Sequence, residues 1–200
     1  MYNVESLYEQ YPKLEVCRDD IKKAFNALVA CYDCDGKVLC CGNGGSAADS
    51  EHIVGELMKG FLLYRPVNDE RIPLEIREKL QGALPAIALT GHPALSSAFA
   101  NDVDPSVIFA QQVYGYARKG DVVLGISTSG NAKNVVNAIT VAKAMGVTTI
   151  ALTGEKGGKI GEIADVAIRV PECETYRIQE LHLPVYHALC AAVEAHYFEK

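Results

Sequence analysis

The most constraining feature of this sequence is a regular alternation, from Gly36 onward, between short apolar runs and segments with helical periodicity. The apolar runs predict strands at 37–41, 85–89, 121–126, 148–152 and 165–170. The segments between them predict helices at 46–59, 93–101, 131–145 and 157–163, and a last helix from about Thr175 to Phe198. Short strands that alternate with helices form parallel sheets with helices on both faces. The predicted fold class is therefore α/β, with a doubly wound five-stranded parallel sheet.

The residues before this alternation have a different pattern. From Val4 to Cys34 the apolar residues recur at helical spacing, which predicts one or two long helices. We expect residues 1–35 to be an N-terminal helical segment for oligomerisation, and residues 36–200 to form one domain. The apolar positions expected to face other subunits are Leu7, Tyr11, Phe25 and Leu28. Residues 66–84 form a charged connection.

Composition excludes several classes of partner. A net charge of −6 and a predicted pI near 5.4 argue against a nucleic-acid surface, which needs a basic patch. No apolar run approaches the roughly 18 residues of a membrane span, and the first residues lack a signal peptide's pattern. The seven cysteines are odd in number and follow no repeated spacing, which predicts reduced thiols. We therefore expect a cytoplasmic protein with neither nucleic-acid nor membrane partners.

Two turns in the alternation are rich in hydroxyl groups and glycine. Ser127-Thr128-Ser129-Gly130-Asn131 follows one apolar run, and Asn43-Gly44-Gly45-Ser46 follows another; each precedes a predicted helix. Main-chain N–H groups at a helix start lack intrahelical partners and lie at the positive end of the helix dipole. Each turn therefore predicts a phosphate site. Both turns follow strands, and ligands of doubly wound sheets bind beyond the carboxyl ends of the strands.

Acid–base residues lie near these turns. His52 and Glu56 are four residues apart on one helix, so they share one face at the margin of its apolar stripe. Partial burial there can tune acid–base behaviour, although the pair taken alone is more typical of an ordinary surface contact. The last predicted helix adds Gln179 and His187 within a quarter of its circumference. Two phosphate turns beside acid–base groups indicate an enzyme that acts on a sugar phosphate.

Five motifs in order give a specific resemblance. They are Cys41-Gly42-Asn43-Gly44-Gly45-Ser46, His52-x-x-x-Glu56, Gly125-Ile126-Ser127-Thr128-Ser129-Gly130-Asn131, Leu152-Thr153-Gly154-x-x-Gly157-Gly158, and Arg177-Ile178-Gln179-Glu180 with His187. Together, from about residue 36 to 190, they resemble the phosphoheptose isomerase family of the sugar isomerase (SIS) domain superfamily. The resemblance implies conversion of sedoheptulose 7-phosphate into an aldoheptose 7-phosphate, D-glycero-D-manno-heptose 7-phosphate, through an enediol. It also implies a homotetramer with active sites at subunit interfaces.

The resemblance also implies roles for residues. The positions that match Glu56 and His187 are catalytic, as the group that takes the proton and its acid–base partner. Some members of the family resemble zinc proteins, with Zn²⁺ held at the positions of His52, Glu56, Gln179 and His187. Gln179 and His187 lie about 12 Å apart along a helix, which suggests that one of them acts across a subunit interface. Substrate binding is implied for Asn43, Gly44, Gly45, Ser46, Asn101, Asp102, Ser127, Thr128, Ser129, Asn131 and Gln179.

Three departures from the family pattern leave the substrate open. Thr90-Gly91 stands where the family has Ser-Asp, Lys59-Gly60 stands where it has Gly-Arg, and Tyr176 replaces an aspartate. The segment 66–84 is also longer than the family's usual link. One alternative is an SIS isomerase for another ketose phosphate. Another is a non-catalytic SIS protein similar to the DnaA initiator-associating protein, although the acid–base set favours an enzyme.

Pro184 is unexpected in the last predicted helix. Proline removes one backbone hydrogen bond and clashes with the preceding turn, at a cost of ~3 kcal/mol or more in a helix interior. We expect a kink near Glu180 and Leu181 that sets the angle between Gln179 and His187. The alternative is a helix that starts near Leu183 and leaves Gln179 in a loop.

Overall fold

The computed structural model describes residues 4–199 and has one parallel sheet at its centre. The strands are β1 (Val38–Cys41), β2 (Ala86–Ala88), β3 (Val122–Ile126), β4 (Thr148–Gly154) and β5 (Val166–Val170). They lie in the order β2-β1-β3-β4-β5, and every neighbouring pair is parallel. The predicted α/β fold with five parallel strands is confirmed.

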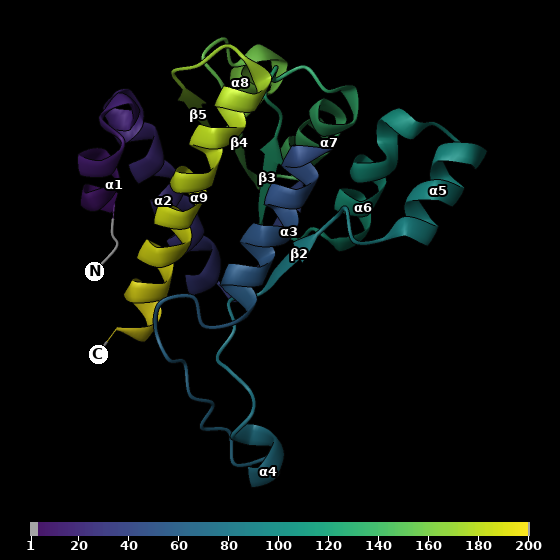
Figure 1. The fold of residues 1–200 in the computed structure, drawn as a ribbon. Coiled ribbons are helices and arrows are strands. Elements are labelled where there is room, and N and C mark those ends of the chain that lie inside the picture. The colour runs from purple at the N-terminus through teal and green to yellow at the C-terminus, as the bar shows by residue number, and fades with distance from the viewer. Residues whose placement is uncertain (1–3, 200) are drawn as a thin grey trace.

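Helices cover both faces of this sheet (Figure 1). One face carries α1 (Val4–Gln10), the 3-10 helix η1 (Pro12–Cys17), α2 (Arg18–Asp33), α3 (Gly45–Met58) and α9 (Thr175–Phe198). The other face carries α6 (Ile108–Tyr116), α7 (Lys133–Ala144) and α8 (Gly158–Ile163). Side chains alternate between the two layers because successive strand residues point to opposite faces. In β1, for example, Val38 and Cys40 belong to the apolar cluster that includes α2 and α9, whereas Leu39 belongs to the cluster that includes α6, α7 and α8.

The N-terminal helices belong to the chain's own core. Leu7 is fully buried and Leu28 is 6% exposed, within the same apolar cluster as α9 and the sheet. The expectation that Leu7 and Leu28 face other subunits is therefore wrong. Tyr11 is exposed and Phe25 is half-buried, so the role of residues 1–35 in assembly stays a prediction.

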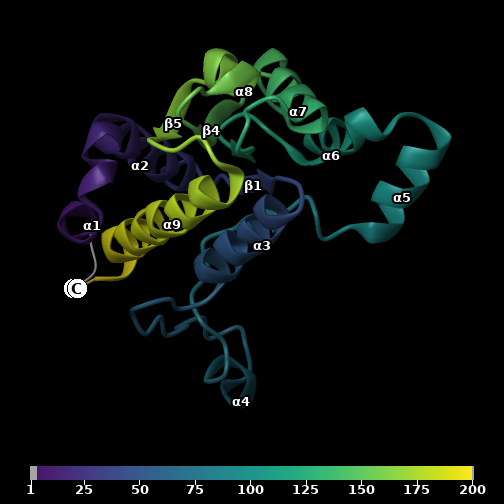
Figure 2. The same ribbon diagram turned by 45° about the horizontal axis from the view of Figure 1, so that its top comes forward.

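Three further elements lie at the margins of the sheet. They are α4 (Leu74–Arg77), α5 (Pro93–Asp102) and the 3-10 helix η2 (Pro105–Val107). The segment with α4 projects from the body of the molecule, and α5 stands apart from the sheet, in both views (Figures 1 and 2). Neither α4 nor α5 has a buried residue. The sequence did not predict α4 or α6.

The strand order indicates where a ligand can bind to the sheet. The chain moves outward from β1 to β2 and then crosses back to β3 on the other side of β1, so the order reverses between β1 and β3. Loops that leave the carboxyl ends of these two strands diverge and leave a crevice. These loops are the two turns predicted to bind phosphate. Within residues 4–199, no helix combines the length and apolarity needed to cross a membrane.

Candidate active site

The two predicted phosphate turns meet in one cavity of about 410 Å³, which we call the cradle. Its lining is neutral and consists mainly of glycine, hydroxyl and amide groups. The residues are Asn43, Gly44, Gly45, Ser46, Ile126, Ser127, Thr128, Ser129, Ala132, Thr175 and Gln179. Because this lining contains no charged side chain, an anion in the cradle would be held by N–H and hydroxyl donors.

Three helices begin at the cradle. Gly45 is the first residue of α3, Ala132 is the N-cap of α7, and Thr175 is the first residue of α9. Each helix start carries about half a positive charge and N–H groups without intrahelical partners. Three such ends around one cavity give a local positive potential in a chain whose net charge is −6. The cradle is therefore suited to a phosphate group.

Hydrogen bonds and close packing hold the turns in place. The side-chain amides of Asn43 and Asn134 donate to each other's oxygens at 2.8 and 2.9 Å, which joins the turn after β1 to α7. Gly130 has φ +67°, and a Cβ there would overlap the backbone of Gly157, so this position requires glycine. Asn131 accepts a hydrogen bond from the N–H of Lys159 at 3.0 Å. Asn131 thus ties the loop to α8 and is not part of the cradle lining.

Gln179 reaches the cradle from α9. A Cβ added to Gly45 would lie only 2.5 Å from Nε2 of Gln179, so the amide lies directly over the start of α3. The absence of a side chain at Gly45 leaves room for this amide. Gln179 can therefore donate to a group bound in the cradle.

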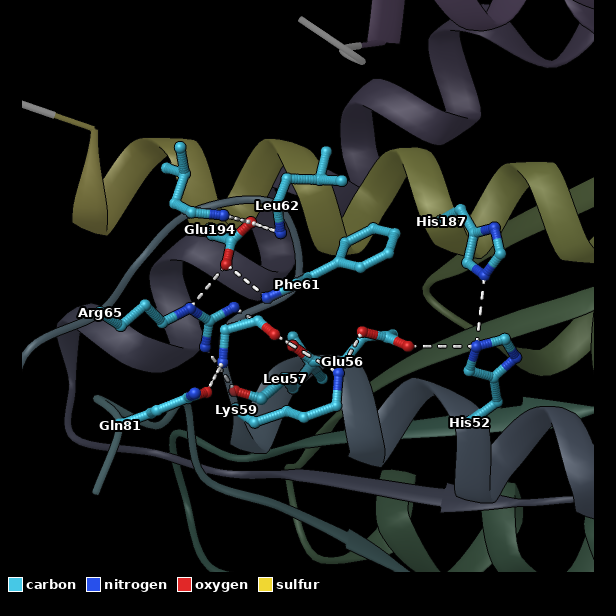
Figure 3. Close-up of polar contacts among 12 residues, drawn as sticks. His52, Glu56, Leu57, Lys59, Phe61, Leu62, Arg65, Gln81, His187 and Glu194 are labelled. Carbon is cyan, nitrogen blue, oxygen red and sulfur yellow. Dashed lines mark hydrogen bonds and ion pairs between the residues drawn. The ribbon is translucent and has the colours of Figure 1, made fainter. Parts of the chain in front are cut away.

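A second cluster of polar groups lies farther along α3 and α9, where His52, Glu56 and His187 point toward one another (Figure 3). Nε2 of His52 lies 3.2 Å from Oε1 of Glu56 and 3.4 Å from Nε2 of His187. Lys59 donates to the other carboxylate oxygen, Oε2 of Glu56, at 2.9 Å. The structure thus brings the predicted acid–base residues together. Lys59 contacts the Glu56 carboxylate and does not line the cradle.

A tyrosine and an aspartate extend this cluster. The hydroxyl of Tyr186 lies 3.0 Å from Nδ1 of His52 and donates to Oδ1 of Asp49 at 3.3 Å. Burial raises the pKa of Asp49, and the hydrogen bond from Tyr186 opposes this shift. Burial and the nearby His52 lower the pKa of His187, with Glu56 acting in the opposite direction. The lowered pKa favours the neutral imidazole of His187, which is the form able to accept a proton.

A second cavity of about 350 Å³ borders His187 on the outer side. It is lined by Gln10, Tyr11, Phe61, Leu62, Leu183, Pro184 and His187. The ring of Phe61 packs against His187 with centroids 5.4 Å apart. The acid–base cluster therefore has an apolar wall on this side, formed by the end of α1 and the residues after α3.

Two predicted binding residues lie elsewhere. Asn101 and Asp102 are exposed at the end of α5, where the Asn101 amide donates to Asp102 at 2.8 Å, and neither lines the cradle. Within residues 4–199, the structure presents no ready-made group of three His, Cys, Asp or Glu ligands around a metal ion. His52, Glu56 and His187 are nevertheless neighbours, whereas Gln179 lies at the cradle.

The sequence did not identify Asp49, Tyr186 or Thr175 as site residues. Asp49 precedes His52 by three residues, so helical spacing offered a weak signal for Asp49. Tyr186 is next to His187 in the chain, and adjacent residues do not face each other on a helix, so spacing offered no signal for Tyr186. Thr175 could be recognised only as the start of the last helix. Pro184 lies inside a helix that spans Thr175–Phe198. The alternative that Gln179 lies in a loop is therefore wrong.

Comparison with known proteins agrees with this geometry. Residues 4–154 match the family model of the SIS domain. The chain is 41% identical to the phosphoheptose isomerase of Rhodospirillum rubrum, over 91% of this chain and 88% of that one. It is 38% identical to the enzyme of the same name from Helicobacter pylori, over 94% and 89%. The structure of phosphoheptose isomerase GmhA from Neisseria gonorrhoeae superposes with a TM-score of 0.79 at 34% identity and covers 96% of this chain and 94% of its own. A chain with this sheet, this cradle and these relatives belongs to the phosphoheptose isomerase family of SIS-domain proteins.

Proposed function

We propose that this protein is an aldose–ketose isomerase that converts sedoheptulose 7-phosphate into D-glycero-D-manno-heptose 7-phosphate. One observation carries the proposal. The same two helices, α3 and α9, form the cradle with their first residues and the acid–base cluster with later turns. A substrate phosphate and the reacting carbons would therefore lie at opposite ends of one binding site.

The spacing of the two ends suits a long sugar phosphate. His52 follows Gly45 by seven residues, which is about 10 Å along α3 at 1.5 Å per residue. An extended seven-carbon chain, phosphorylated at one end and reacting at the other, spans a similar length. A triose or tetrose phosphate held in the cradle would not reach Glu56.

Glu56 and His187 carry out different proton transfers. Glu56 takes the proton from C1 of the ketose, and the resulting enediol accepts a proton at C2 to give the aldose. His187, neutral at rest, accepts a proton from one oxygen and returns it to the other. Lys59 and His52 flank the Glu56 carboxylate and keep it oriented between them. The cradle holds the phosphate fixed throughout.

We also propose that Zn²⁺ can bind at His52, Glu56 and His187, in a form of the site in which these side chains are metal ligands and do not carry the transferred protons. The two Nε2 atoms of the histidines face each other at 3.4 Å, and at most one of them can carry the shared proton. Two ligands of a tetrahedral zinc ion are separated by about 3.3 Å, since each bond is ~2.0 Å long. Bound zinc would polarise the carbonyl and hydroxyl oxygens of the sugar. Gln179 as a fourth ligand stays a prediction, and the zinc content of the purified protein tests the site.

Assembly and location complete the proposal. We infer a homotetramer with active sites at subunit interfaces, supported by exposed apolar side chains beside the His187 cavity, such as Tyr11 and Leu62. Asn101 and Asp102, which lie away from the cradle of their own chain, would contribute only across such an interface. All seven cysteines are free thiols, in keeping with the reducing cytoplasm.

Turnover of a panel of ketose phosphates of five, six and seven carbons tests the proposed function. We expect sedoheptulose 7-phosphate to give the highest kcat/KM, because a seven-carbon chain matches the span from the cradle to the acid–base cluster best. Preference for a shorter ketose phosphate would establish an SIS isomerase with another substrate. No turnover of any ketose phosphate, with or without added Zn²⁺, would contradict an isomerase and favour a non-catalytic SIS protein.

A further inference from the structure

A buried ion pair lies next to the acid–base cluster and takes no direct part in it. Arg65 and Glu194 are both fully buried, and Nε of Arg65 donates to Oε1 of Glu194 at 2.8 Å. Arg65 follows α3 in the chain, whereas Glu194 lies on α9. We call this pair the Arg65–Glu194 clamp (Figure 3).

Arg65 holds the end of the helix that carries Glu56. Its guanidinium donates to the carbonyl oxygens of Leu57, at 2.8 Å, and of Glu56 itself, at 3.1 Å. The last four carbonyls of a helix have no intrahelical partners, and a cation near that end interacts favourably with the helix dipole. Because α3 ends at Met58, Arg65 fixes the last turn of α3 and hence the backbone of Glu56.

Glu194 holds the segment between the end of α3 and Arg65. Its carboxylate accepts hydrogen bonds from the backbone N–H groups of Phe61, Leu62 and Leu63, at 2.8, 2.7 and 3.2 Å. This turn places the ring of Phe61 against His187. Glu194 follows His187 by seven residues, two helical turns, and therefore lies on the same face of α9.

Stability alone is a poor explanation for the clamp. Removing two charges from water costs several kcal/mol each, and apolar residues of similar volume often serve equally well in a core. The clamp has a geometric consequence, however, because it connects the backbone of Glu56 to the helix of His187. At the other side of the cluster, Tyr186 connects α9 to His52 and Asp49.

We propose that Arg65 and Glu194 are positioning residues that set the distance and angle between the Glu56 carboxylate and the His187 imidazole. The inference rests on the catalytic roles proposed above for Glu56 and His187. Arg65→Lys keeps a positive charge beside Glu194 but loses the planar fork that reaches two carbonyls at once. Misplacement of a reacting group by 1 Å can lower a rate by about 100-fold, so we expect kcat to fall about 10- to 100-fold. KM for sedoheptulose 7-phosphate should stay within about twofold, because the cradle is untouched.

Asp121 provides a matched control. It is a buried carboxylate that accepts hydrogen bonds from two backbone N–H groups, those of Lys37 and Arg118, and from the Lys37 ammonium. It directly precedes β3 and so lies at the amino end of this central strand, whereas the cradle lies at the carboxyl end. Glu194→Gln and Asp121→Asn should both lower the melting temperature, but only Glu194→Gln should lower kcat. Equal kcat losses in the two variants would overturn the proposal.

A double-mutant cycle separates positioning from general loss of structure. If Arg65 acts through Glu56, Arg65→Lys should cause little further loss of kcat in a Glu56→Gln background. An equal factor of loss in both backgrounds, or wild-type kcat in Arg65→Lys, would overturn the positioning role alone. Wild-type kcat in Glu56→Gln would overturn the proposed role of Glu56, and with it the positioning inference. The kcat of Glu56→Gln therefore distinguishes a failure of the proposed function from a failure of the positioning role.

Discussion

A carboxylate that takes a proton from carbon must be ionised and must face the substrate. Contacts with Lys59 and His52, one on each carboxylate oxygen, hold the Glu56 side chain in one orientation beside His187. We predict that Glu56→Gln and His187→Asn each lower kcat by about 10²–10⁴-fold, the usual contribution of general acid–base catalysis. Steady-state isomerisation of sedoheptulose 7-phosphate measures the effect.

The control for this prediction is a carboxylate on the same helix. Glu51 is exposed on α3 and accepts a hydrogen bond from Thr90 at 3.0 Å, away from the histidines. Glu51→Gln should keep wild-type kcat. A rise in KM with unchanged kcat in the Glu56 and His187 variants would assign these residues to binding instead.

The cradle offers a second test at the scale of one residue. Gly45→Ala would place a methyl group against the amide of Gln179 and displace this flexible side chain while α3 stays intact. A hydrogen bond to a charged group contributes about 1.5–3 kcal/mol, so we predict a rise of roughly 10- to 100-fold in KM and a smaller change in kcat. Gly55→Ala, on the same helix with nothing within 4 Å of the added Cβ, is the matched control and should leave KM unchanged. Equal KM values for both variants would remove Gln179 from the binding site.

Among the elements, strands were predicted better than helices. A buried parallel strand is a short apolar run between polar turns, and the predicted strand ends lie within two residues of those observed. The helix α6 was missed because Tyr114, Gly115 and Tyr116 interrupt its apolar stripe. Its buried residues are Phe109, Ala110, Gln112 and Val113, so only two large apolar side chains, four residues apart, marked its packed face. The short helix α4 has no buried residue and gave no periodic signal.

The role of Pro184 in α9 could not be predicted from the sequence. It continues through Pro184, which is buried between the cradle residue Gln179 and the acid–base residue His187. Pro184→Ala restores a backbone donor, worth ~3 kcal/mol in a helix interior, and loses about two buried CH₂ groups at about 0.8 kcal/mol each. We predict a net gain in stability of about 1 kcal/mol and a lower kcat, because the relative placement of Gln179 and His187 changes.

Thermal unfolding and steady-state kinetics together check this prediction. Leu183→Ala is the control, since Leu183 is exposed and lines the same cavity beside His187. This variant should show neither the gain in stability nor the loss of kcat. If Pro184→Ala is more stable and retains wild-type kcat, the proline is only tolerated in α9.

At the scale of the whole molecule, the sequence predicted the parts of the site but not how they combine. Both phosphate turns and the residues His52, Glu56 and His187 follow local motifs, and local motifs are visible in a sequence. The Arg65–Glu194 clamp joins residues 129 positions apart, and no local pattern links them. The convergence of three helix starts likewise depends on the strand order, which sequence periodicity does not specify.

The stability of the whole chain should depend on pH through His182. This histidine of α9 is fully buried, and neither of its ring nitrogens has a hydrogen-bond partner within residues 4–199. Burial lowers its pKa to about 4, with the nearby backbone of Thr153 opposing the shift in part. In the unfolded chain a histidine titrates near pH 6.5. Between these two pH values the unfolded state binds a proton that the folded state excludes, so the free energy of unfolding falls as the pH falls.

The full shift corresponds to about 3 kcal/mol of stability, present above pH 6.5 and lost by about pH 4, at 1.36 kcal/mol per pKa unit. We predict that His182→Leu flattens this part of the stability profile, because a leucine has no proton to bind in either state. Urea unfolding at a series of pH values between 4 and 7 measures the slope. His196→Leu, at an exposed position of the same helix, should keep the wild-type slope. An unchanged slope in His182→Leu would mean that other groups control the acid stability of the fold.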